Sequence, residues 1–403
     1  MKYSTASISL ASLAAVALAQ DSSSSMMMSG SGSMSMSGSS SAAAATSTGM
    51  SGSGNSTYAS GLVAALQAAN LTTLASVLGG FPDLATQLEM GGNATVFAPN
   101  NAALSPLLAD PSSVNQTMIA EILSYHISPM TLPVSALGMG MNHTIAPSML
   151  MEPLLGMNQI APLVLSIGMD GQPRVRTAAQ NVTVLGNTTY QNLLVHVVNE
   201  VIMPPMNLTS TLSGANLTAL TGALSMVSEE LPMALSNTPR LTVFAPADSA
   251  FANISSTLQT LNQSTIMTVL ANHIINGTVV YSTAIMNDTT AISAAGETFT
   301  FAMNNGTLTV MSGEMAMARV IRSDIPITNG VVHIIDQVLA NTMSNTEAAA
   351  SAASSYAAAA TASPSGVAPA GSNGNGNTGA ATKSAVVGFS LVAALFGGFA
   401  ILA

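Results

Sequence analysis

Asn329 to Leu339 reads Asn-Gly-Val-Val-His-Ile-Ile-Asp-Gln-Val-Leu, and this stretch decides the fold. The Asn-Gly pair is a turn signal, and the run Val331 to Ile335 that follows is β-branched except at His333. Such a run predicts a short strand that is covered on both faces. A similar pattern, Val-His-Val-Val-Asn-Glu-Val-Ile, occupies Val195 to Ile202 and indicates an internal duplication.

Two further pairs of segments show that the duplication is collinear. Thr-Val-Phe-Ala-Pro begins at Thr95 and recurs 147 residues later at Thr242, and His126 lies the same 147 residues before His273. The histidines of the two β-branched runs, His196 and His333, are 137 residues apart. The segment from His126 to His196 in the first copy is therefore about ten residues longer than the segment from His273 to His333 in the second.

These landmarks resemble the signature blocks of the fasciclin domain, in two consecutive copies over residues 58 to 343. The resemblance implies structural roles for Thr95, Phe97, Pro99, Tyr125, His126, His196, Thr242, Phe244, Pro246, His273, Asn329, Gly330, His333 and Asp336. It also implies partner binding through a short Asp-Ile segment before the last block, which Asp324 and Ile325 match.

The copies depart from the family pattern at three positions. Asn272 stands where the first copy has Tyr125, Leu193 replaces the turn glycine that is Gly330 in the second copy, and Asn199 stands at the position of Asp336. The turn of the first copy is therefore expected to differ, while its strand is not.

Composition excludes several classes of function. Only 6% of the 403 residues are charged, the formal net charge is -10, and Lys and Arg together number 7, so no basic surface exists to bind nucleic acid. The chain has no Cys, which excludes disulfides, thiolate metal sites and a cysteine nucleophile.

The first 56 residues are predicted to lie outside the folded part. Residues 1–19 have the pattern of a secretory signal peptide, with an apolar run and small residues before Gln20. Residues 20–56 are rich in Ser, Met and Gly and are expected to be a disordered arm. Its methionines, Met26 to Met36, allow an alternative function, weak surface capture of Cu(I) by thioethers. Met139, Met141 and His143 could nominally join a copper site, although packing is the plainer interpretation.

The residues between the landmarks predict an α+β fold. Leu62, Ala65, Leu66 and Ala69 recur at helical spacing, and a helix is expected after Pro99, capped by Asn100 or Asn101. Asp248 is expected to cap the matching helix in the second copy. Hairpins are predicted at Asp170-Gly171 and Asn305-Gly306. Helices followed by hairpins indicate two tandem domains, at residues 57–204 and 205–343, each with a small sheet packed against helices.

The C-terminal region resembles a signal for a glycosylphosphatidylinositol (GPI) anchor. Residues 344–384 form an Ala, Ser, Gly and Asn stalk that is expected to be disordered, and the apolar tail at residues 385–403 is expected to be removed. A retained transmembrane helix is the alternative, although no basic residue follows the tail. A dinucleotide-like glycine pattern from Gly374 to Gly379 lacks a preceding strand and is discounted. The candidate attachment residues are Asn373, Gly374, Asn375, Gly376 and Asn377.

Asparagine usage supports a secretory route. Fourteen Asn-x-Ser/Thr acceptors for N-glycosylation are present: Asn55, Asn70, Asn93, Asn115, Asn142, Asn181, Asn187, Asn207, Asn216, Asn253, Asn262, Asn276, Asn287 and Asn305. Asn93, beside the predicted strand at Thr95, is the one expected to be sterically blocked.

The sequence offers no recognisable catalytic or cofactor-binding pattern. None of the five histidines has a Ser or acidic partner at a catalytic spacing, and four of them occupy repeated positions, which favours a structural role. His143 has no counterpart in the second copy and is interpreted as a loop residue. We therefore expect a non-enzymatic glycoprotein without cofactor, GPI-anchored at the extracellular face of the plasma membrane or in a cell wall. The resemblance to the fasciclin domain implies a role in adhesion through binding of wall or matrix protein or polysaccharide, and the GPI signal with a stalk that lacks Cys suggests a walled eukaryote such as a fungus.

Overall fold

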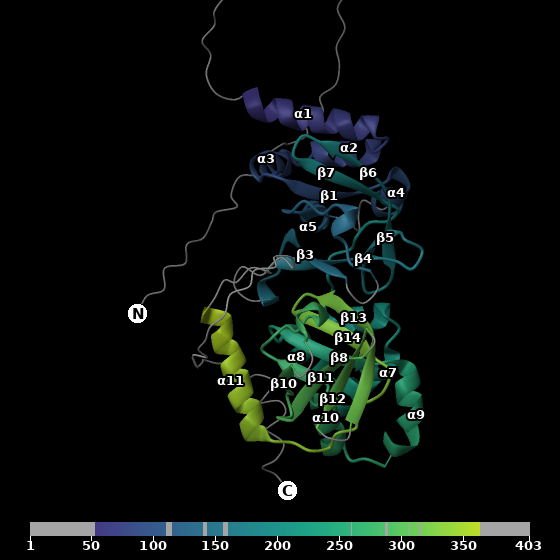
Figure 1. The fold of residues 1–403 in the computed structure, drawn as a ribbon, viewed down its shortest axis with the longest axis vertical. Helices are drawn as coiled ribbons and strands as arrows, with labels where there is room; N and C mark the ends of the chain where they lie inside the picture. The colour runs from purple at the N-terminus through teal and green to yellow at the C-terminus, as the bar shows by residue number, and fades with distance from the viewer. Residues whose placement is uncertain are drawn as a thin grey trace, which may run out of the picture. The chain divides into compact units, whose positions relative to one another are not determined.

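The structure is a computed structural model that describes residues 53–109, 115–139, 143–155, 160–258, 260–286, 289–304, 306–313 and 316–362. The predicted signal peptide, the Met-rich arm up to residue 52 and the predicted GPI signal lie outside these ranges. Two α+β domains follow one another in the described chain, as the duplication predicts (Figure 1).

Domain 1 begins with helices and ends with a sheet. Its elements are α1 (Ser53–Ala68), α2 (Thr72–Gly79), α3 (Pro82–Met90), β1 (Ala94–Pro99), α4 (Asn101–Ala109), α5 (Gln116–Tyr125), β2 (Ile127–Ser128), η1 (Val134–Ala136), β3 (Thr144–Met151), η2 (Pro153–Leu155), β4 (Ile160–Ile167), β5 (Pro173–Arg176), β6 (Asn181–Tyr190) and β7 (Leu193–Val198).

Domain 2 repeats this order, and one helix follows it. Its elements are α6 (Leu208–Gly214), α7 (Thr218–Val227), α8 (Leu231–Asn237), β8 (Leu241–Pro246), α9 (Asp248–Leu258), α10 (Gln263–Ala271), β9 (Ile274–Asn276), η3 (Ser282–Ala284), β10 (Thr290–Ile292), β11 (Thr298–Asn304), β12 (Thr307–Ser312), β13 (Ala316–Ile327) and β14 (Gly330–Ile335), and then α11 (Thr346–Ala362).

The sheets of the two domains have the same topology. Within the described ranges the strand order is β2-β1-β7-β6-β5-β4-β3 in domain 1 and β9-β8-β14-β13-β12-β11-β10 in domain 2. The first long strand pairs in parallel with the last, β1 with β7 and β8 with β14, and the other pairings are antiparallel. The register places Phe97 opposite His196 and Phe244 opposite His333.

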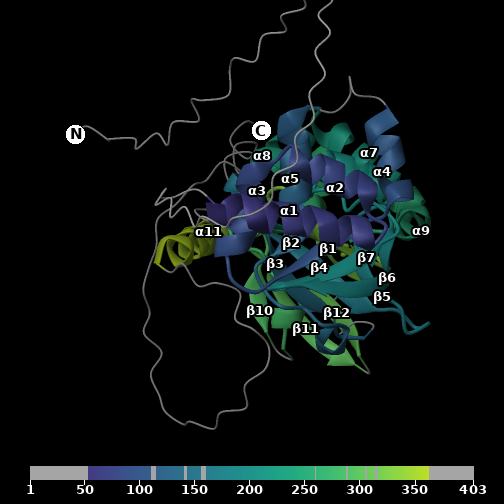
Figure 2. The ribbon, with the colours of Figure 1, turned by 90° about the horizontal axis from the view of Figure 1, so that it is seen from above.

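The paired strands of each domain are buried on both faces. In domain 1, Ala94 and Ala98 of β1 contact the core formed with α1, α2 and α3, whereas Phe97 belongs to a second core formed with β3 to β6. Figure 2 shows the helices of domain 1 on one side of its strands. All six residues of β14 are buried, so the predicted two-sided strand is confirmed. The hairpin predictions are also confirmed, with positive φ at Gly171 and Gly306.

One part of the capping prediction is confirmed and one is wrong. Asn100 accepts a hydrogen bond from the backbone N–H of Ala103 at 2.8 Å, which caps α4 as expected. Asp248 does not cap α9; its carboxylate instead accepts from the N–H of Ala219 at 3.0 Å and from the Thr218 hydroxyl at 2.7 Å. Asn101 does the same for α2 in domain 1, where it accepts from the N–H of Thr73.

The physical reason lies at the start of α2 and α7. The N-cap positions of these helices are Leu71 and Leu217, whose side chains have no oxygen to accept a free N–H. A polar residue at the beginning of a distant helix therefore supplies the acceptor.

Parts of both segments that were predicted to be disordered are helical. Helix α1 begins at Ser53, inside the predicted arm, and α11 occupies Thr346–Ala362 of the predicted stalk. Alanine is the best helix former, and Asn345 caps α11 by accepting from the N–H of Ala348 at 3.0 Å. The hydroxyl of Tyr356 accepts from the N–H of Ile292 at 3.0 Å, so α11 covers the edge strand β10 (Figure 1).

We predict that Asp248→Ala lowers the free energy of unfolding of domain 2 by about 1 kcal/mol, because two donors at the start of α7 lose their acceptor. Asp248→Asn is the matched control, since it restores the residue type that domain 1 uses at Asn101. Urea unfolding followed by circular dichroism measures both variants. An Ala variant as stable as the wild type would show that the cap contributes nothing.

Candidate functional site

Two of the repeated histidines end helices and bind backbone on both sides of the ring. Nδ1 of His126 lies 2.7 Å from the carbonyl oxygen of Ile122, and Nε2 accepts from the N–H of Ile202 at 2.9 Å. His273 is bonded in the same way, with Nδ1 next to the carbonyl oxygen of Val269 and Nε2 accepting from the N–H of Leu339. Because Nε2 is an acceptor, Nδ1 carries the proton and donates it. Burial lowers the pKa of both histidines to about 4, so these rings are neutral structural ties.

The other two repeated histidines lie in the last strand of each domain. Nε2 of His333 donates to the carbonyl of Val280 at 2.8 Å, and Nδ1 accepts from the N–H of Asp324 at 3.2 Å. Nε2 of His196 makes the matching bond to Leu132, but its Nδ1 is buried without a partner. Burial lowers the pKa of both rings. The prediction that His333 finds its partners inside the fold is confirmed.

The remaining motif residues also bind backbone. The Thr95 hydroxyl donates to the carbonyl of Met130 and accepts from the N–H of Leu132, and Thr242 does the same with Thr278 and Val280. The rings of Phe97 and Phe244 lie against His196 and His333, with centroids 5.5 and 5.3 Å apart. Pro99 and Pro246 are the last residues of β1 and β8.

The side chains at the positions where the copies differ also bind backbone groups, although Tyr125 and Asn272 bind different segments. Tyr125 donates its hydroxyl hydrogen to the carbonyl of Pro162, whereas the buried Asn272 donates to the carbonyls of Asn341 and Met343. Asp336 accepts from the N–H of Arg319 at 2.7 Å, and Asn199 accepts from Thr183 at the same distance.

The turn before the last strand differs between the copies, as expected. In domain 2 a side chain at Gly330 would collide with the backbone of Leu241, while Asn329 donates to the carbonyls of Leu235 and Thr238. In domain 1 the strand still begins at Leu193, and the preceding turn uses a positive φ of 47° at Gln191. The strand itself is therefore preserved without the glycine.

A buried ionic cluster surrounds Asp324. Its carboxylate accepts from Nε2 of His143 at 2.6 Å and from the N–H of Ser282 at 2.7 Å, and the Ser282 hydroxyl also donates to it. Arg176 lies on the other side of His143, with its Nη1 3.3 Å from Nδ1. Asp324 has a positive φ of 58° and sits at an irregularity in the pairing of β13 with β14.

The charge of Asp324 is stabilised inside the protein. Burial alone would raise the pKa of this carboxyl, but the hydrogen bond from His143, the charges of His333 and His143 and the hydrogen bond from Ser282 hold it at about 2. His143 comes from domain 1 and Asp324 from domain 2, so this pair ties the domains together. The interpretation of His143 as an ordinary loop residue missed this role, because its partner lies 181 residues away.

The partner-binding prediction for Asp324 and Ile325 does not hold in this structure. Both residues are only 1% exposed, the carboxylate is fully engaged within the chain, and Ile325 packs into the core of domain 2. A buried residue cannot contact a partner, so these two residues are assigned to packing and to the ionic cluster.

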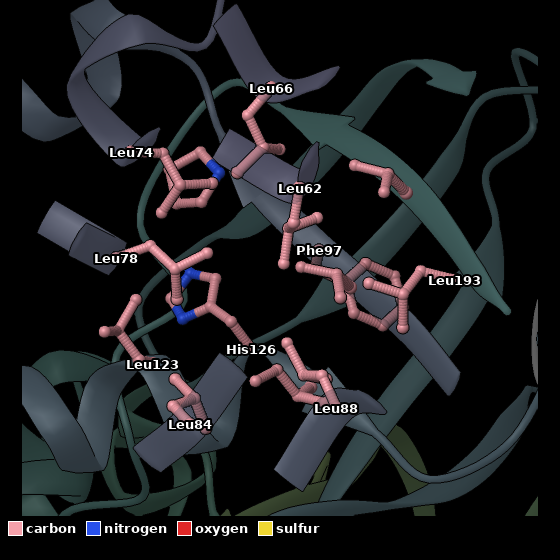
Figure 3. A pocket seen from close by; sticks show the side chains of 14 residues that line it. Leu62, Leu66, Leu74, Leu78, Leu84, Leu88, Phe97, Leu123, His126 and Leu193 are labelled. Atoms are coloured by element: carbon pink, nitrogen blue, oxygen red, sulfur yellow. The ribbon is translucent and has the colours of Figure 1, made fainter. Parts of the chain in front are cut away.

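An apolar hollow in domain 1 is small (Figure 3). Its volume is about 30 Å³, which is room for water-sized molecules and not for a metabolite. Figure 3 shows leucines converging on it together with Phe97 and His126, and both ring nitrogens of His126 are already bonded. The hollow therefore offers no group for catalysis or specific recognition.

Metal binding finds no support in the part of the chain that the structure describes. No group of three His, Asp or Glu residues there is arranged to hold an ion. Met139 is exposed, His143 is held by Asp324, and Met141 lies outside the described residues, as does the Met-rich arm. Copper capture by the arm stays a prediction.

Most of the predicted glycosylation sites are accessible. Nine of the fourteen asparagines are exposed: Asn70, Asn93, Asn115, Asn181, Asn187, Asn207, Asn216, Asn253 and Asn262. Asn276 is half-buried, and the side chains of Asn55, Asn142, Asn287 and Asn305 lie outside what the structure describes. Asn93 is exposed although it precedes β1, so the steric argument against it does not hold. Which sites carry glycan stays a prediction.

The chain contains two tandem α+β domains. In each domain the first long strand pairs in parallel with the last strand, and two buried histidines bind backbone groups around this pair. These shared features define a class of protein. A model of the fasciclin domain matches residues 69–204 and 215–341. The chain belongs to the fasciclin domain family.

The chain is also similar to several individual proteins, of which the first is named after the fasciclin family. The chain is 24% identical over 286 residues to a fasciclin-like arabinogalactan protein of Arthroderma benhamiae, covering 67% of this chain and 63% of that protein. It is 32% identical to protein sll1483 of Synechocystis, over 32% of this chain and 72% of the relative. Immunogenic protein MPB70 of Mycobacterium bovis is 30% identical, over 36% of this chain and 68% of the relative. The chain also aligns with a solved structure of a fasciclin domain pair from the insect cell adhesion molecule fasciclin I. The alignment covers 70% of this chain and 97% of that chain at 18% identity. Its TM-score is 0.33, so this match does not contribute to the assignment.

We predict that His333→Ala destabilises domain 2 by about 1 to 3 kcal/mol, because the carbonyl of Val280 and the N–H of Asp324 are left unpaired beside a cavity. His333→Gln should lose less, since an amide can restore part of the bonding. His196→Ala is the matched control in domain 1; it should cost less, because only one bond is lost there. An unchanged melting temperature combined with lost adhesion would make this strand the binding site instead.

We predict that acid destabilises domain 2 more than domain 1. Burial lowers the pKa of His126 and His273 from 6.5 to about 4, so the unfolded chain takes up protons first and stability falls as the pH drops through this window. In domain 1 burial raises the pKa of Glu152 from 4.5 to about 7, so the folded state takes up a proton there and offsets part of the loss. Asp324 titrates only near pH 2 and does not contribute in this window.

Hydrogen exchange measures this difference at the amides of α5 and α10, compared at about pH 7 and about pH 5. The ratio of protection should fall further in α10. His273→Gln removes the titrating ring and should flatten the response of domain 2. Equal losses in both domains would contradict the assignment to these groups.

Proposed function

We propose that this protein is a non-enzymatic, GPI-anchored surface glycoprotein whose two fasciclin domains bind protein or polysaccharide of the cell wall or extracellular matrix. The observation that carries the proposal is the fasciclin match in both domains, at residues 69–204 and 215–341. The polar motif residues are occupied by structural hydrogen bonds, which leaves recognition to the surface of the domains.

The accessible glycosylation acceptors support the same proposal. The nine exposed acceptors lie on both domains, as suits a chain that passes through the secretory pathway. One of the relatives is itself named a fasciclin-like arabinogalactan protein. None of the helices in the described ranges has the length and apolar character needed to cross a membrane, and the anchor is proposed from the sequence at residues 373 to 403.

Release from cells tests the anchor. We expect phosphatidylinositol-specific phospholipase C to release the mature protein, and peptide mapping to find neither residues 1–19 nor residues 385–403 in it. Recovery of a peptide from Ala385 to Ala403 would contradict GPI anchoring and favour a membrane-spanning tail.

The released protein then tests binding. It is incubated with insoluble wall polysaccharides and with whole cells, before and after enzymatic removal of N-glycans. We expect retention in both states, because the proposal assigns binding to the domains. Retention that disappears with the glycans would assign adhesion to the sugar chains, and no retention on any surface would overturn the proposal.

A further inference from the structure

Methionine is found at the surface and not in the cores of the described residues. Twelve methionine side chains are among the exposed large hydrophobic residues, and none is among the buried residues of either domain. The exposed ones are Met90, Met130, Met139, Met151, Met169, Met203, Met206, Met226, Met233, Met286, Met317 and Met343. Leucine behaves in the opposite way, with only Leu108 and Leu185 exposed.

This division runs against the usual behaviour of the residue. Methionine is normally among the most buried side chains, because its flexible thioether fills irregular gaps in a core. Here the buried residues of all four cores are Leu, Ile, Val, Ala, Phe and Tyr, with no methionine among them. Hydrophobicity therefore does not explain where the methionines lie.

The chemistry of the thioether distinguishes methionine from leucine. Peroxides oxidise methionine to its sulfoxide, which turns an apolar side chain into a polar one and disrupts a core that contains it. The chain has no Cys, so the thioether is its only sulfur. A fold whose exposed methionines lie outside its cores can take up oxygen at those sulfur atoms while the cores stay unchanged.

We propose that the exposed methionines form an oxidation-tolerant surface that consumes hydrogen peroxide. In each event the sulfur attacks one peroxide oxygen, the O–O bond breaks and an S–O bond forms. The thioether and hydrogen peroxide become a sulfoxide and water; sulfur is oxidised by two electrons and the peroxide is reduced. The polar product points into solvent at side chains such as Met169 and Met90, which are 107% and 79% exposed.

A second group of methionines limits this tolerance. Met118, Met149, Met267, Met303 and Met311 are half-buried, and Met149, Met267 and Met303 pack against the cores. Oxidation of these residues would place a polar oxygen against apolar side chains. The proposal therefore requires two phases, a fast one without structural effect and a slow one that loosens the fold.

The experiment is a titration of the full chain with hydrogen peroxide, followed by peptide mapping for sulfoxide and by melting temperature. We expect the twelve exposed methionines to react at least about fivefold faster than the five half-buried ones. While only the exposed group is oxidised, the melting temperature should shift by less than about 4 °C. Similar rates in both groups, or a melting temperature that falls with the first sulfoxides, would overturn the proposal.

Two variants serve as controls. Replacing Met90, Met169, Met226 and Met286 by Leu removes four of the twelve fast sites and should reduce the fast peroxide consumption of the described domains by one third. Leu163→Met places a thioether at a position with 0% exposure without changing the surface, and it should stay unoxidised during the fast phase. Unchanged consumption in the first variant, or early oxidation of the second, would contradict the proposal; the wild-type map decides the question even if a variant does not fold.

Discussion

The structure of each domain depends on the parallel pairing of its first long strand with its last. Strands β1 and β7, like β8 and β14, lie side by side, although most of the domain separates them in the sequence. A parallel pair has no short connection, so the chain between them has to leave the sheet and return. Here it forms helices on one face and a run of antiparallel strands that folds over the other. Both faces of the central strands are thereby buried.

The repeated polar residues serve this pairing. Water does not reach the loops that pack around a strand buried on both faces. Each buried carbonyl or N–H of these loops therefore needs a hydrogen-bond partner from the domain itself. Thr242, His273 and His333 supply such partners in domain 2, and Thr95, His126 and His196 in domain 1. The polar residues that recur in both copies of this chain are thus those that allow the backbone to be buried.

Local signals in the sequence were sufficient for most of the strands and hairpins, but not for the helices at the two ends of the described chain or for the distant contacts. The β-branched run at Val331 to Ile335 and the turn at Gly171 depend on neighbouring residues, and both were predicted correctly. The cap formed by Asp248 and the hydrogen bond between His143 and Asp324 join residues 29 and 181 positions apart, which no local pattern reveals. Helix α11 was missed because its composition resembles a linker, while Tyr356 and the glycines that it approaches give it a surface to pack on.

The pairing of first and last strands also governs when a domain can form during synthesis. Strand β8 emerges from the ribosome long before β14. One edge of β8 can pair early with β9, but the edge that binds β14 has no native partner until nearly the whole domain has been translated. Contacts between residues so far apart in the chain slow folding, because the loop between them has to close first. The nascent domain therefore passes through a period in which its central strand is exposed.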